Sequence, residues 1–580
     1  MANDQTLESV VAVDCGDVFT KAALIDLVEG RYRLIARGEA FSTHRMPHMN
    51  IVTGVTRAIA QIERRTGRRL LDQHAQLIFP ERGDGSGIDA FVLTADAGRP
   101  LRLFLAGLTN EASLASARAA AQQGFALVAD SISLEDGLDR PEGIESALAR
   151  FEQAEADAII LAGGVDGGAS TRLLDIASTL ALALRMSGSS TRPPVIYAGN
   201  QALSDSITAI FGELTDVRVV DNVRPSIDVQ NLAPLAAELQ KLYVERKLNR
   251  LPGMGGVAGW SRVPILPSTQ AKCYTLSYLA SQRYRRVISV EVGASQTTIS
   301  WAMDGQANFV TRHGWGTMAG EQVVREAGLS HLLRWVPESC EPDEAAEIIQ
   351  NLILYPGVAP GSRREVDLAQ AMARVMAFPL IEQARRHWYS KAWDEVPPWD
   401  AILLGGTLLT RTLSPGRAAL FALDVLQPVG ISTLLSDSVS LAAPLGALAA
   451  LEPLAAAHVA DSSAFVNLGT LVALAGSAKT GDIALRVRVA YADGRSLRLE
   501  VPCGSLDVIP LGPGEKAILE LRPGRRFGLG PAHDRRKLTI EVMGGALGIV
   551  VDARGRPLPS VEDLPAAQAR MQQWMWDVGA

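Results

Sequence analysis

The sequence predicts an α/β protein in which two similar strand–turn–strand units flank a stretch of alternating strands and helices, with a β-rich region towards the C-terminus. Three observations predict this class. Apolar strands that run into an acidic residue and a glycine occur at 10–30 and again at 286–305. Strand and helix patterns alternate over 75–225, which indicates a parallel or mixed sheet with helices on its faces. After 462 the pattern changes to alternating apolar and polar residues, which is typical of half-buried strands.

The first segment of the chain is expected to form three strands and a helix. Continuous apolar residues at 10–13 and 22–25 predict two strands, and Gly30 marks the turn before the third. The segment IVTGVTRAIAQIERR, residues 51–65, has apolar residues at helical spacing, so a helix is expected there.

The middle of the chain alternates between apolar runs and helical patterns. The expected strands are 101–108, 125–130, 157–164, 194–200 and 217–222, and the expected helices are 111–123, 142–154, 170–186 and 202–212. Residues 250–270 are rich in glycine and proline, so we expect a long loop or a domain junction there.

The second half of the chain begins with helices and ends with strands. Helical patterns dominate 320–390 and 415–460, and a buried strand at 400–410 runs into a glycine turn. The dipeptide Asp493-Gly494 between two alternating runs predicts a β-hairpin.

The last residues, 561–580, are expected to form a short helix. Its Trp574 and Trp576 are expected to dock on the chain itself or on a partner, because exposed tails rarely keep two tryptophans. The expected domains are a first lobe at 1–70, an α/β insertion continuing it at 71–225, a linker or helical junction at 226–285, a second lobe at 286–460, and a β-rich domain with a terminal helix at 461–580.

Composition excludes several classes of function. The chain has 580 residues, of which 47% are hydrophobic and 21% charged, as in ordinary globular proteins. Its formal net charge of −7 argues against nucleic acid as a partner. The four cysteines form no CxxC pair, so we expect neither a disulfide framework nor a zinc site, and a cytoplasmic location. We expect no membrane span and no signal peptide.

The first turn, DCGDVFTK, carries residue types suited to a phosphate. Gly16 would let backbone N–H groups approach a phosphate closely. Asp14 would hold Mg²⁺ through water, because hard cations prefer carboxylate oxygen. Lys21 would place its charge near a β- or γ-phosphate, and Asp17 and Thr20 complete the turn. The alternative is a polar hairpin without a ligand.

A second turn repeats this layout. Glu291 ends an apolar strand, Gly293 follows, and Ser295, Thr297 and Thr298 lead into the next strand. The repetition makes a pair of facing acid–glycine turns a more specific signal than either turn alone.

A third element follows the strand at 400–410. The paired glycines Gly405 and Gly406, with Thr407 after them, would let an adenine or a ribose lie flat against the backbone.

This constellation resembles the superfamily of acetate kinase, sugar kinases, heat-shock chaperones and actin, in which two ribonuclease-H-like domains clamp Mg-ATP between two phosphate loops. Within it, the chain is most similar to the glutamate mutase accessory family called MutL or GlmL, which is unrelated to the mismatch-repair protein of similar name. The likeness spans about residues 1–455. The segments that carry it are DCGDVFTKAALIDL at 14–27, LRLFLAGLTNEASLASARAAAQQGFALV at 101–128, DAIILAGGVDGGAST at 157–171, PVIYAGNQALSD at 194–205, VISVEVGASQTTIS at 287–300 and ILLGGTLLT at 402–410.

The resemblance implies two actin-like lobes with an α/β insertion, and ATP or ADP with Mg²⁺ as the ligand. It implies an ATP-linked chaperone or reactivating factor for a cobalamin-dependent mutase, with a mutase subunit or a related accessory protein as partner; it assigns no cobalamin site to this chain. It makes Asp14 and Glu291 the candidate Mg²⁺ ligands. The implied nucleotide- and phosphate-binding residues are Asp14, Gly16, Asp17, Thr20, Lys21, Glu291, Gly293, Ser295, Thr297, Thr298, Gly405, Gly406 and Thr407.

Both loops depart from the family pattern. Asp17 replaces a serine or threonine that would donate to a phosphate, and an ionised carboxylate cannot donate. In the second loop Glu291, Ala294 and Thr298 replace an aspartate, a glycine and an aspartate. We therefore hypothesise a weak or absent ATPase on an intact fold, and no catalytic residue is assigned. A competing hypothesis makes Asp17 an extra Mg²⁺ ligand that preserves binding.

The departures also favour an alternative function. The chain would be a non-catalytic scaffold that assembles with itself or with an intact paralogue, as a homo- or hetero-oligomer. A small-molecule kinase is a weaker interpretation, because the sequence offers no further acid or base for a substrate hydroxyl.

Two other motifs have structural interpretations that we favour. AGGVDGGA at 162–169 would bind a phosphate at a helix N-terminus, but a tight structural turn or a partner surface is the preferred interpretation. His44 and His48 have a spacing that metal sites use, but a polar loop before a helix is preferred. Cys273 is expected to be packed within a helix.

Overall fold

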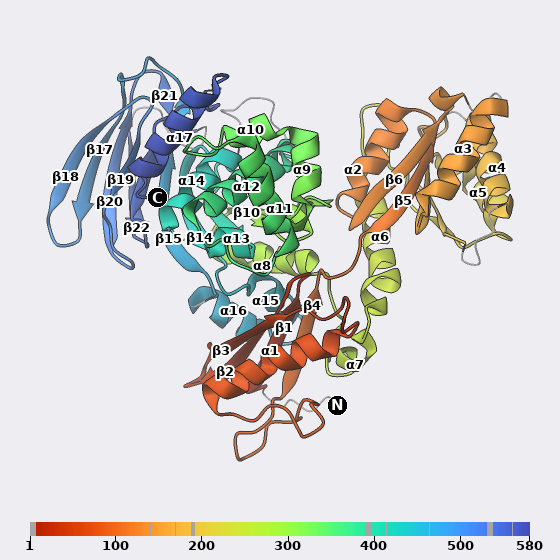
Figure 1. The fold of residues 1–580 in the computed structure, drawn as a ribbon, viewed down its shortest axis with the longest axis horizontal. Coiled ribbons are helices and arrows are strands. Elements are labelled where there is room, and N and C mark those ends of the chain that lie inside the picture. The colour runs from red at the N-terminus through yellow and green to blue at the C-terminus, as the bar shows by residue number, and fades with distance from the viewer. Residues whose placement is uncertain are drawn as a thin grey trace. The chain divides into compact units, whose positions relative to one another are not determined.

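The computed structural model describes residues 7–137, 141–168, 170–186, 192–388, 397–411, 414–462, 464–530, 537–559 and 561–580. The chain divides into two compact units (Figure 1). The larger unit comprises Met1–Ala97, Pro252–Val310 and Gly314–Ala580, and the smaller comprises Gly98–Leu251 and Thr311–His313. Both units combine sheets with packed helices, which confirms the predicted α/β class.

The first lobe of the larger unit is a four-stranded sheet with the order β3-β2-β1-β4. Its strands are β1 Ser9–Cys15, β2 Phe19–Val28, β3 Arg31–Phe41 and β4 Ala90–Ala95. β1, β2 and β3 are antiparallel neighbours, and β4 runs parallel to β1. Helix α1, Ile51–Thr66, packs against β3 where Gly38 leaves room, since a Cβ there would lie 1.9 Å from the Ala58 carbonyl oxygen. The three strands and the helix predicted for this segment are confirmed.

The second lobe repeats this sheet topology. An antiparallel run of three strands is again followed by a strand parallel to the first, in the order β12-β11-β10-β13. Its strands are β10 Arg286–Val292, β11 Gln296–Met303, β12 Gln306–His313, β13 Ala401–Gly405 and β14 Gly430–Ser436. The repeat brings the predicted acid–glycine turns to equivalent positions, each between the first and second strands of its sheet.

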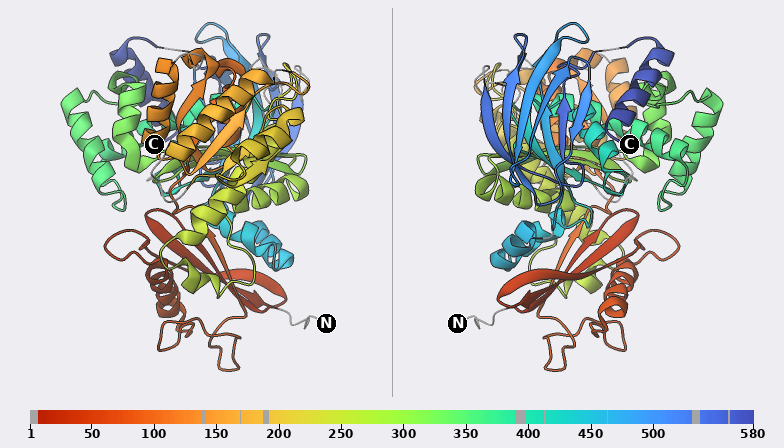
Figure 2. Two further views of the ribbon diagram at one scale, coloured as in Figure 1. Left: turned by 90° about the vertical axis from the view of Figure 1, so that its right-hand side faces the viewer. Right: turned by 90° about the vertical axis from the view of Figure 1, so that its left-hand side faces the viewer.

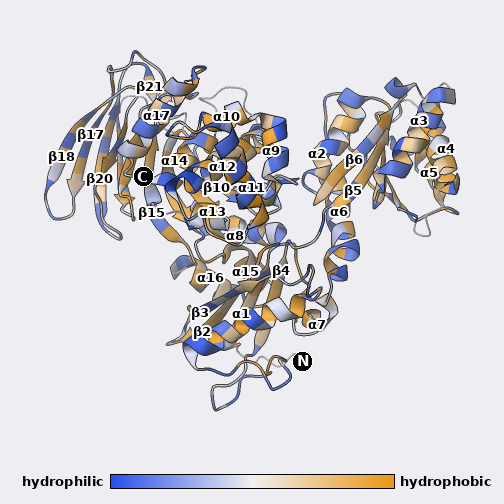
Figure 3. Cartoon of the chain, viewed as in Figure 1, coloured by the Kyte–Doolittle hydropathy of each residue, from blue (hydrophilic) through white to orange (hydrophobic). Residues whose placement is uncertain are grey.

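Helices cover the second lobe and enclose its largest hydrophobic core. They are η5 Thr317–Ala319, α9 Gly320–Ala327, α10 Leu329–Leu333, α11 Pro342–Leu354, α12 Arg363–Arg385, α13 Thr407–Thr410 and α14 Pro415–Leu426. Helix α12 is buried along most of its length, whereas α9 presents hydrophilic residues outward (Figure 3).

The continuous helical character predicted over 415–460 is wrong, because β14 interrupts it. This strand, GISTLLS, pairs with β13 on one side and β15 on the other. Its burial on both sides produces a short apolar run without alternation, which sequence periodicity does not distinguish from a buried helix.

The C-terminal region contributes strands to two places. β15 Val466–Ala473, β23 Ile549–Asp552 and β19 Leu506–Ile509 extend the sheet of the second lobe. The other strands form a four-stranded sheet, β18-β17-β20-β22, and a two-stranded one, β16-β21. Their bounds are β16 Ala475–Gly476, β17 Ile483–Tyr491, β18 Ser496–Pro502, β20 Lys516–Pro523, β21 Phe527–Gly528 and β22 Leu538–Met543. The hairpin predicted at Asp493-Gly494 joins β17 to β18 and is confirmed.

The terminal helix α17, Leu564–Asp577, lies beside α10, α14 and β19 (Figure 2). Trp574 is buried against the chain itself, with its ring 4.3 Å from the Arg554 guanidinium carbon, whereas Trp576 is 77% exposed. Arg554 in turn pairs with Asp552 of β23 and Asp424 of α14 at 2.9 and 2.8 Å. This buried ionic cluster joins the terminal helix, β23 and the second lobe.

The smaller unit is a parallel five-stranded sheet with the order β6-β5-β7-β8-β9, as the alternating pattern predicted. Its strands are β5 Leu101–Gly107, β6 Ala126–Ser133, β7 Ala158–Ala162, β8 Val195–Tyr197 and β9 Val217–Val219. Its helices are η1 Asn110–Leu114, α2 Ala115–Ala121, η2 Leu134–Asp136, α3 Pro141–Ala154, α4 Thr171–Met186, η3 Gln201–Leu203, α5 Ser204–Phe211, α6 Ala233–Arg246 and η4 Leu248–Arg250.

The glycine-rich turn after β7 is held by the turn after β8. Asn200 accepts a hydrogen bond from the Gly167 N–H at 3.2 Å and donates to the Gly168 carbonyl at 3.3 Å. A Cβ at Gly199 would lie 2.6 Å from the Gly163 carbonyl oxygen. These contacts support the interpretation of AGGVDGGA as a structural turn; its Ala169 lies outside the described residues.

Two crossing helices form the junction between the lobes of the larger unit. They are α8, Ser268–Gln282, and α15, Ala442–Leu448; the short helices α7, Met254–Ala258, and α16, Pro453–Ser462, lie nearby in the chain. A Cβ at Gly446 would lie 1.7 Å from the Ala271 carbonyl oxygen, so only glycine allows this approach. Cys273 is buried in α8, as predicted. No described helix is both long and apolar enough to cross a membrane.

We predict that Gly446→Ala lowers the thermal unfolding midpoint by several degrees, because forcing apart two packed helices costs about 1–3 kcal/mol. The matched control is Gly255→Ala in α7, where no atom lies within 4 Å of the added carbon. That change should leave the midpoint unchanged or raise it slightly. Equal midpoints for the two variants would contradict the packing described for α8 and α15.

Candidate functional site

A cavity of about 270 Å³ lies between the two lobes of the larger unit, and both acid–glycine turns open into it. We call this cavity the cleft. The predicted site residues that line it are Asp14, Gly16, Asp17, Lys21, Glu291, Gly293, Gly406 and Thr407. Two turns that are far apart in the sequence therefore meet at one place.

The remaining predicted residues lie behind this lining. Thr20 is buried, with its hydroxyl 3.0 Å from that of Ser42. The Thr297 hydroxyl donates to the Trp315 carbonyl at 2.5 Å, and Thr298 is buried beside it on β11. Gly405 lies beneath the Glu291 side chain, which a Cβ there would contact at 3.5 Å. These residues shape the turns from within.

Asp14 is the next-to-last residue of β1 and is held by two hydroxyl groups. Its Oδ1 accepts from Thr94 Oγ1 at 2.8 Å and from Ser268 Oγ, on the first turn of α8, at 2.5 Å. These bonds fix the carboxylate at the floor of the cleft.

Asp96, directly after β4, lies behind Asp14 and caps the same helix. It accepts from the Ser268 N–H at 2.9 Å and from Thr269 Oγ1 at 3.1 Å, and from Gln296 of the second turn at 3.0 Å. Burial, together with the nearby charge of Asp14, raises the pKa of Asp96 to about 6. Asp96 thereby connects the first lobe, α8 and the second turn.

Asp17 is the residue that replaces the expected hydroxyl, and its side chain is only 4% exposed. Its Oδ1 lies 2.6 Å from Arg45 Nη2 and 3.2 Å from His44 Nε2. Burial alone would raise the pKa of Asp17, but hydrogen bonds from His44 and Ser295 and the charge of Arg45 hold it below its usual value. Because Ser295 belongs to the second turn, Asp17 links the two turns directly.

Glu291 is the next-to-last residue of β10 and forms an ion pair with Lys272, a buried residue one turn into α8. Burial lowers the pKa of Lys272, and the carboxylates of Asp437 and Asp96 oppose that shift. Asp437 itself caps α15 by accepting from the backbone N–H groups of residues 441 and 442. The second acid of the cleft is thus neutralised by a protein ammonium group.

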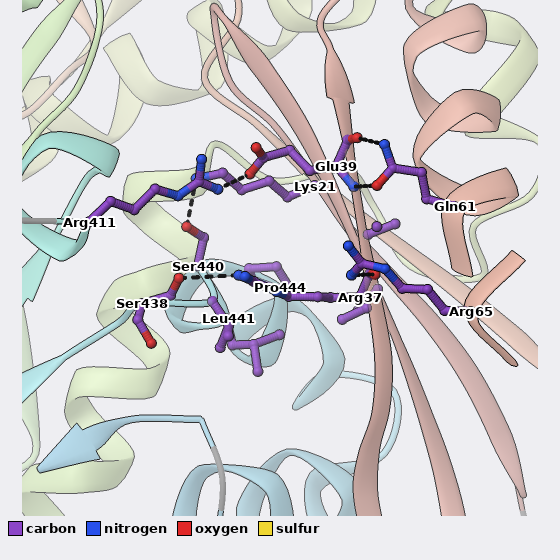
Figure 4. A pocket seen from close by; sticks show the side chains of 15 residues that line it. Lys21, Arg37, Glu39, Gln61, Arg65, Arg411, Ser438, Ser440, Leu441 and Pro444 are labelled. Carbon is purple, nitrogen blue, oxygen red and sulfur yellow. Dashed lines mark hydrogen bonds and ion pairs between the residues drawn. The ribbon is translucent and has the colours of Figure 1, made fainter. Parts of the chain in front are cut away.

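Two further cations stand at the side of the cleft. Lys21 Nζ donates to Ser440 Oγ at 2.7 Å, and Arg411 forms an ion pair with Glu39 of β3 (Figure 4). The Arg411 guanidinium carbon also lies 5.8 Å from the centre of the Phe19 ring. Lys21 of the first lobe and Arg411 of the second therefore lie together at one edge of the cleft.

The Gly406 turn requires glycine for a structural reason. Its φ is +85°, and a Cβ would lie 2.2 Å from the Val292 carbonyl oxygen. This close approach places Thr407, the first residue of α13, against the end of β10. The turn presents its backbone to the cleft, as the flat surface predicted for adenine or ribose would require.

The opposite wall of the cleft is apolar. It consists of the end of α11, the loop between α11 and α12 and one face of α12, namely Leu352, Pro356, Val358, Ala359, Pro360, Val366, Ala369 and Met372. Gly357 in this loop meets Phe41 of the first lobe, since a Cβ there would lie 2.3 Å from the Phe41 ring. The cleft thus offers charged groups on one side and an apolar surface on the other, which suits a ligand with a phosphate end and a ring.

The sequence did not reveal four residues that position this site, Lys272, Asp96, His44 and Arg411. Lys272 is one of only eight lysines in the chain, and its place among small residues in a helix was the available signal. His44 was considered together with His48 as a metal pair, but its partner is Asp17, and His48 is exposed. Within the described residues, no group of three or more histidine, cysteine or acidic side chains could hold a metal.

The repeated sheet topology and the shared cleft define a two-lobed protein of the actin-like fold class. The family model described as MutL protein matches residues 10–464. The chain belongs to this family, which confirms the resemblance found in the sequence. The curated protein MutL from Clostridium tetanomorphum is 25% identical over 218 residues, 37% of this chain and 44% of that relative. The match thus spans less than half of the relative's length.

Several solved structures are matched over most of this chain at low sequence identity. A nucleotide-free acetone carboxylase is matched over 86% of this chain and 81% of its own, with 10% identity and a TM-score of 0.33. Gluconate kinase from Lactobacillus acidophilus is matched over 78% and 91%, with 12% identity and a TM-score of 0.29. The activator of 2-hydroxyisocaproyl-CoA dehydratase from Clostridium difficile is matched over 77% and 95%, with 9% identity and a TM-score of 0.27. TM-scores this low support no conclusion about function.

We predict that Asp17→Asn destabilises the protein at pH 7, because it removes the charge that His44, Arg45 and Ser295 bind. The pKa of Asp17 is lowered by folding, so its contribution is present above the unfolded value of about 4 and is lost as the pH falls through the lower folded value. Thermal midpoints of wild type and variant should therefore differ at pH 7 and converge as the pH falls below about 4.

The control for this prediction is Glu29→Gln, which removes an exposed ion pair with Arg33 at 3.9 Å. Exposed pairs contribute little, so this variant should match wild type throughout the pH range. A difference between wild type and Asp17→Asn that stays constant down to pH 3 would show that the charge of Asp17 is not what matters.

Proposed function

We propose that the protein is an actin-like accessory protein that binds ATP or ADP in the cleft between its lobes. The observation that carries this proposal is that two acid–glycine turns, one from each lobe, line a single cavity. The Gly16 and Gly293 N–H groups donate within their own turns, to the carbonyls of Phe19 and Gln296. The neighbouring backbone N–H groups of the two turns would bind a chain of phosphates from both sides.

Charged and apolar groups of the cleft would bind different parts of a nucleotide. Lys21 and Arg411 would face the phosphates, and the Gly405-Gly406 turn and the apolar wall would hold the nucleoside. Thr20, Thr297 and Thr298 would support the turns from behind, and Gly16, Gly293 and Thr407 would present their backbone.

A Mg²⁺ ion would be held by Asp14 through water, with the phosphates supplying further oxygens, because Mg²⁺ keeps several waters and needs only one or two carboxylates. The side chains present fit this arrangement at Asp14, whose fixed carboxylate lines the cleft. Glu291 is the poorer candidate, because the ammonium group of Lys272 already neutralises it. Mg²⁺ would neutralise charge on the phosphates.

We propose further that turnover is slow or absent. Asp17 cannot donate to a phosphate while ionised, and its lowered pKa keeps it ionised at neutral pH. Its negative charge would also repel a phosphate placed between the turns. These features support a protein in which bound nucleotide changes the conformation and is hydrolysed slowly or not at all.

The partner follows from the family. We propose that the protein is an ATP-linked chaperone or reactivator that acts on a subunit of a cobalamin-dependent mutase of the glutamate mutase type, with nucleotide changing the affinity of the two proteins for each other. The second candidate is a pseudo-ATPase scaffold that assembles with itself or an intact paralogue. The contacts of Asp96 favour this candidate, because it accepts from Ser268 and Thr269 of α8 and from Gln296 of the second turn and so joins the lobes without a ligand.

We predict that Mg-ADP and Mg-ATP each raise the thermal midpoint by several degrees at millimolar concentration. Ligand at about 100 times its Kd stabilises by about 2.7 kcal/mol. Asp14→Ala should abolish the shift. Asp17→Ser, which restores a hydroxyl donor, should increase phosphate release from ATP by at least about tenfold, since each 1.4 kcal/mol of the barrier is a factor of ten.

No shift in the wild type with either nucleotide would overturn the nucleotide proposal and make the scaffold the preferred function. A shift that is equal in Asp14→Ala would place the nucleotide outside the cleft. Vigorous phosphate release by the wild type, abolished by Asp14→Ala, would overturn the proposal of slow turnover.

A further inference from the structure

A second cavity, of about 300 Å³, opens beside the cleft at the edge of the first lobe (Figure 4). We call it the side pocket. It lies along β3, the edge strand of the first sheet, and reaches α1 on one side and the 438–441 segment between β14 and α15 on the other. Its polar lining residues are Lys21, Arg37, Glu39, Gln61, Arg65, Arg411, Ser438 and Ser440.

The side pocket concentrates positive charge. Lys21, Arg37, Arg65 and Arg411 line it, and Glu39 is the one carboxylate among its lining residues. The chain as a whole carries a net charge of −7, so this local excess of cations runs against its general charge. A concave surface lined mainly by one sign of charge attracts ligands of the opposite sign.

The one carboxylate of the side pocket does not neutralise all four of its cations. Arg411 pairs with Glu39, which accounts for the carboxylate. Arg37 donates to the Ser438 carbonyl at 3.3 Å, and Arg65 donates to the Arg37 carbonyl at 2.5 Å. Neither of these two contacts is with a carboxylate, and both side chains are exposed, so solvent screens their charges but leaves them available to an anion in the pocket.

The walls of the pocket are rigidly built. The Gln61 side chain binds both the N–H and the carbonyl of Glu39, which occupies the open edge of β3 at this point. Ser440 has a φ of +56°, an uncommon conformation for a residue other than glycine, and it directs its hydroxyl to the Lys21 ammonium group at 2.7 Å. Backbone strain of this kind persists where the surrounding structure enforces it, and it is concentrated at binding sites.

We propose that the side pocket binds a small molecule with at least two negative charges, either a phosphate ester or a dicarboxylate. Guanidinium groups present paired N–H donors that match the oxygens of both anions, and two of them approach the pocket from different elements, β3 and α1. The volume suits a small metabolite. The side pocket adjoins the nucleotide cleft and shares Lys21 and Arg411 with it. Arg37 and Arg65 line the side pocket and not the cleft, so the proposal does not depend on nucleotide binding.

Calorimetric titration of the full-length protein with inorganic phosphate, and separately with succinate, tests the proposal at pH 7.5. At least one of the two anions should bind the wild type, and its affinity should fall at least tenfold in the double variant Arg37→Ala/Arg65→Ala. The matched control is Arg33→Ala/Arg64→Ala, which removes two exposed arginines from the same strand and helix but outside the lining. The control should bind like wild type.

The two titrations also distinguish the two classes of anion. Binding of phosphate alone would assign a phosphate ester, and binding of succinate alone a dicarboxylate. Equal affinity in the two double variants, or no binding of either anion to the wild type at millimolar concentration, would overturn the proposal. If the double variant fails to fold, the single variant Arg65→Ala should weaken binding in the same direction, and wild-type affinity there would overturn the proposal equally.

Discussion

Helix α8 provides the interactions on which the cleft depends. Its first turns supply the Ser268 and Thr269 groups that bind Asp14 and Asp96 of the first lobe, and the Lys272 ammonium group that pairs with Glu291 of the second. A buried charge is destabilising unless it is paired, and here the buried Lys272 pairs with Glu291, whose side chain is 36% exposed. One helix therefore positions the acids of both lobes, and the rest of the site is arranged around it.

This arrangement holds the shape of the cleft through contacts within the protein. The acids that would face a metal already have protein partners, so the cleft is organised before any ligand arrives. Asp17 follows the same principle. It stands where a hydroxyl that donates a hydrogen bond to phosphate was expected, and its charge is bound by His44, Arg45 and Ser295. The fold brings two similar turns to one cleft, and the contacts of Asp96 and Glu291 hold the lobes to α8 without a ligand.

The sequence revealed the parts of this structure that depend on local pattern. The strand–turn–strand units, the parallel sheet of the smaller unit and the hairpin at Asp493-Gly494 all follow from periodicity and turn residues. The two turns could be paired because their layouts repeat. Lys272 and Asp96 could not be assigned, because their roles depend on contacts across the lobes that no local pattern records. β14 was missed for a related reason, since a strand buried on both sides lacks alternation.

The proposed function requires that both turns bind one ligand. Hydrogen–deuterium exchange of the full-length protein with and without saturating Mg-ADP measures this at each turn. We expect peptides covering 14–21 and 291–298 both to exchange more slowly with nucleotide, together with 405–411, while the β17–β18 hairpin is unchanged. Slower exchange confined to one of the two turns, or no change in either, would contradict the claim.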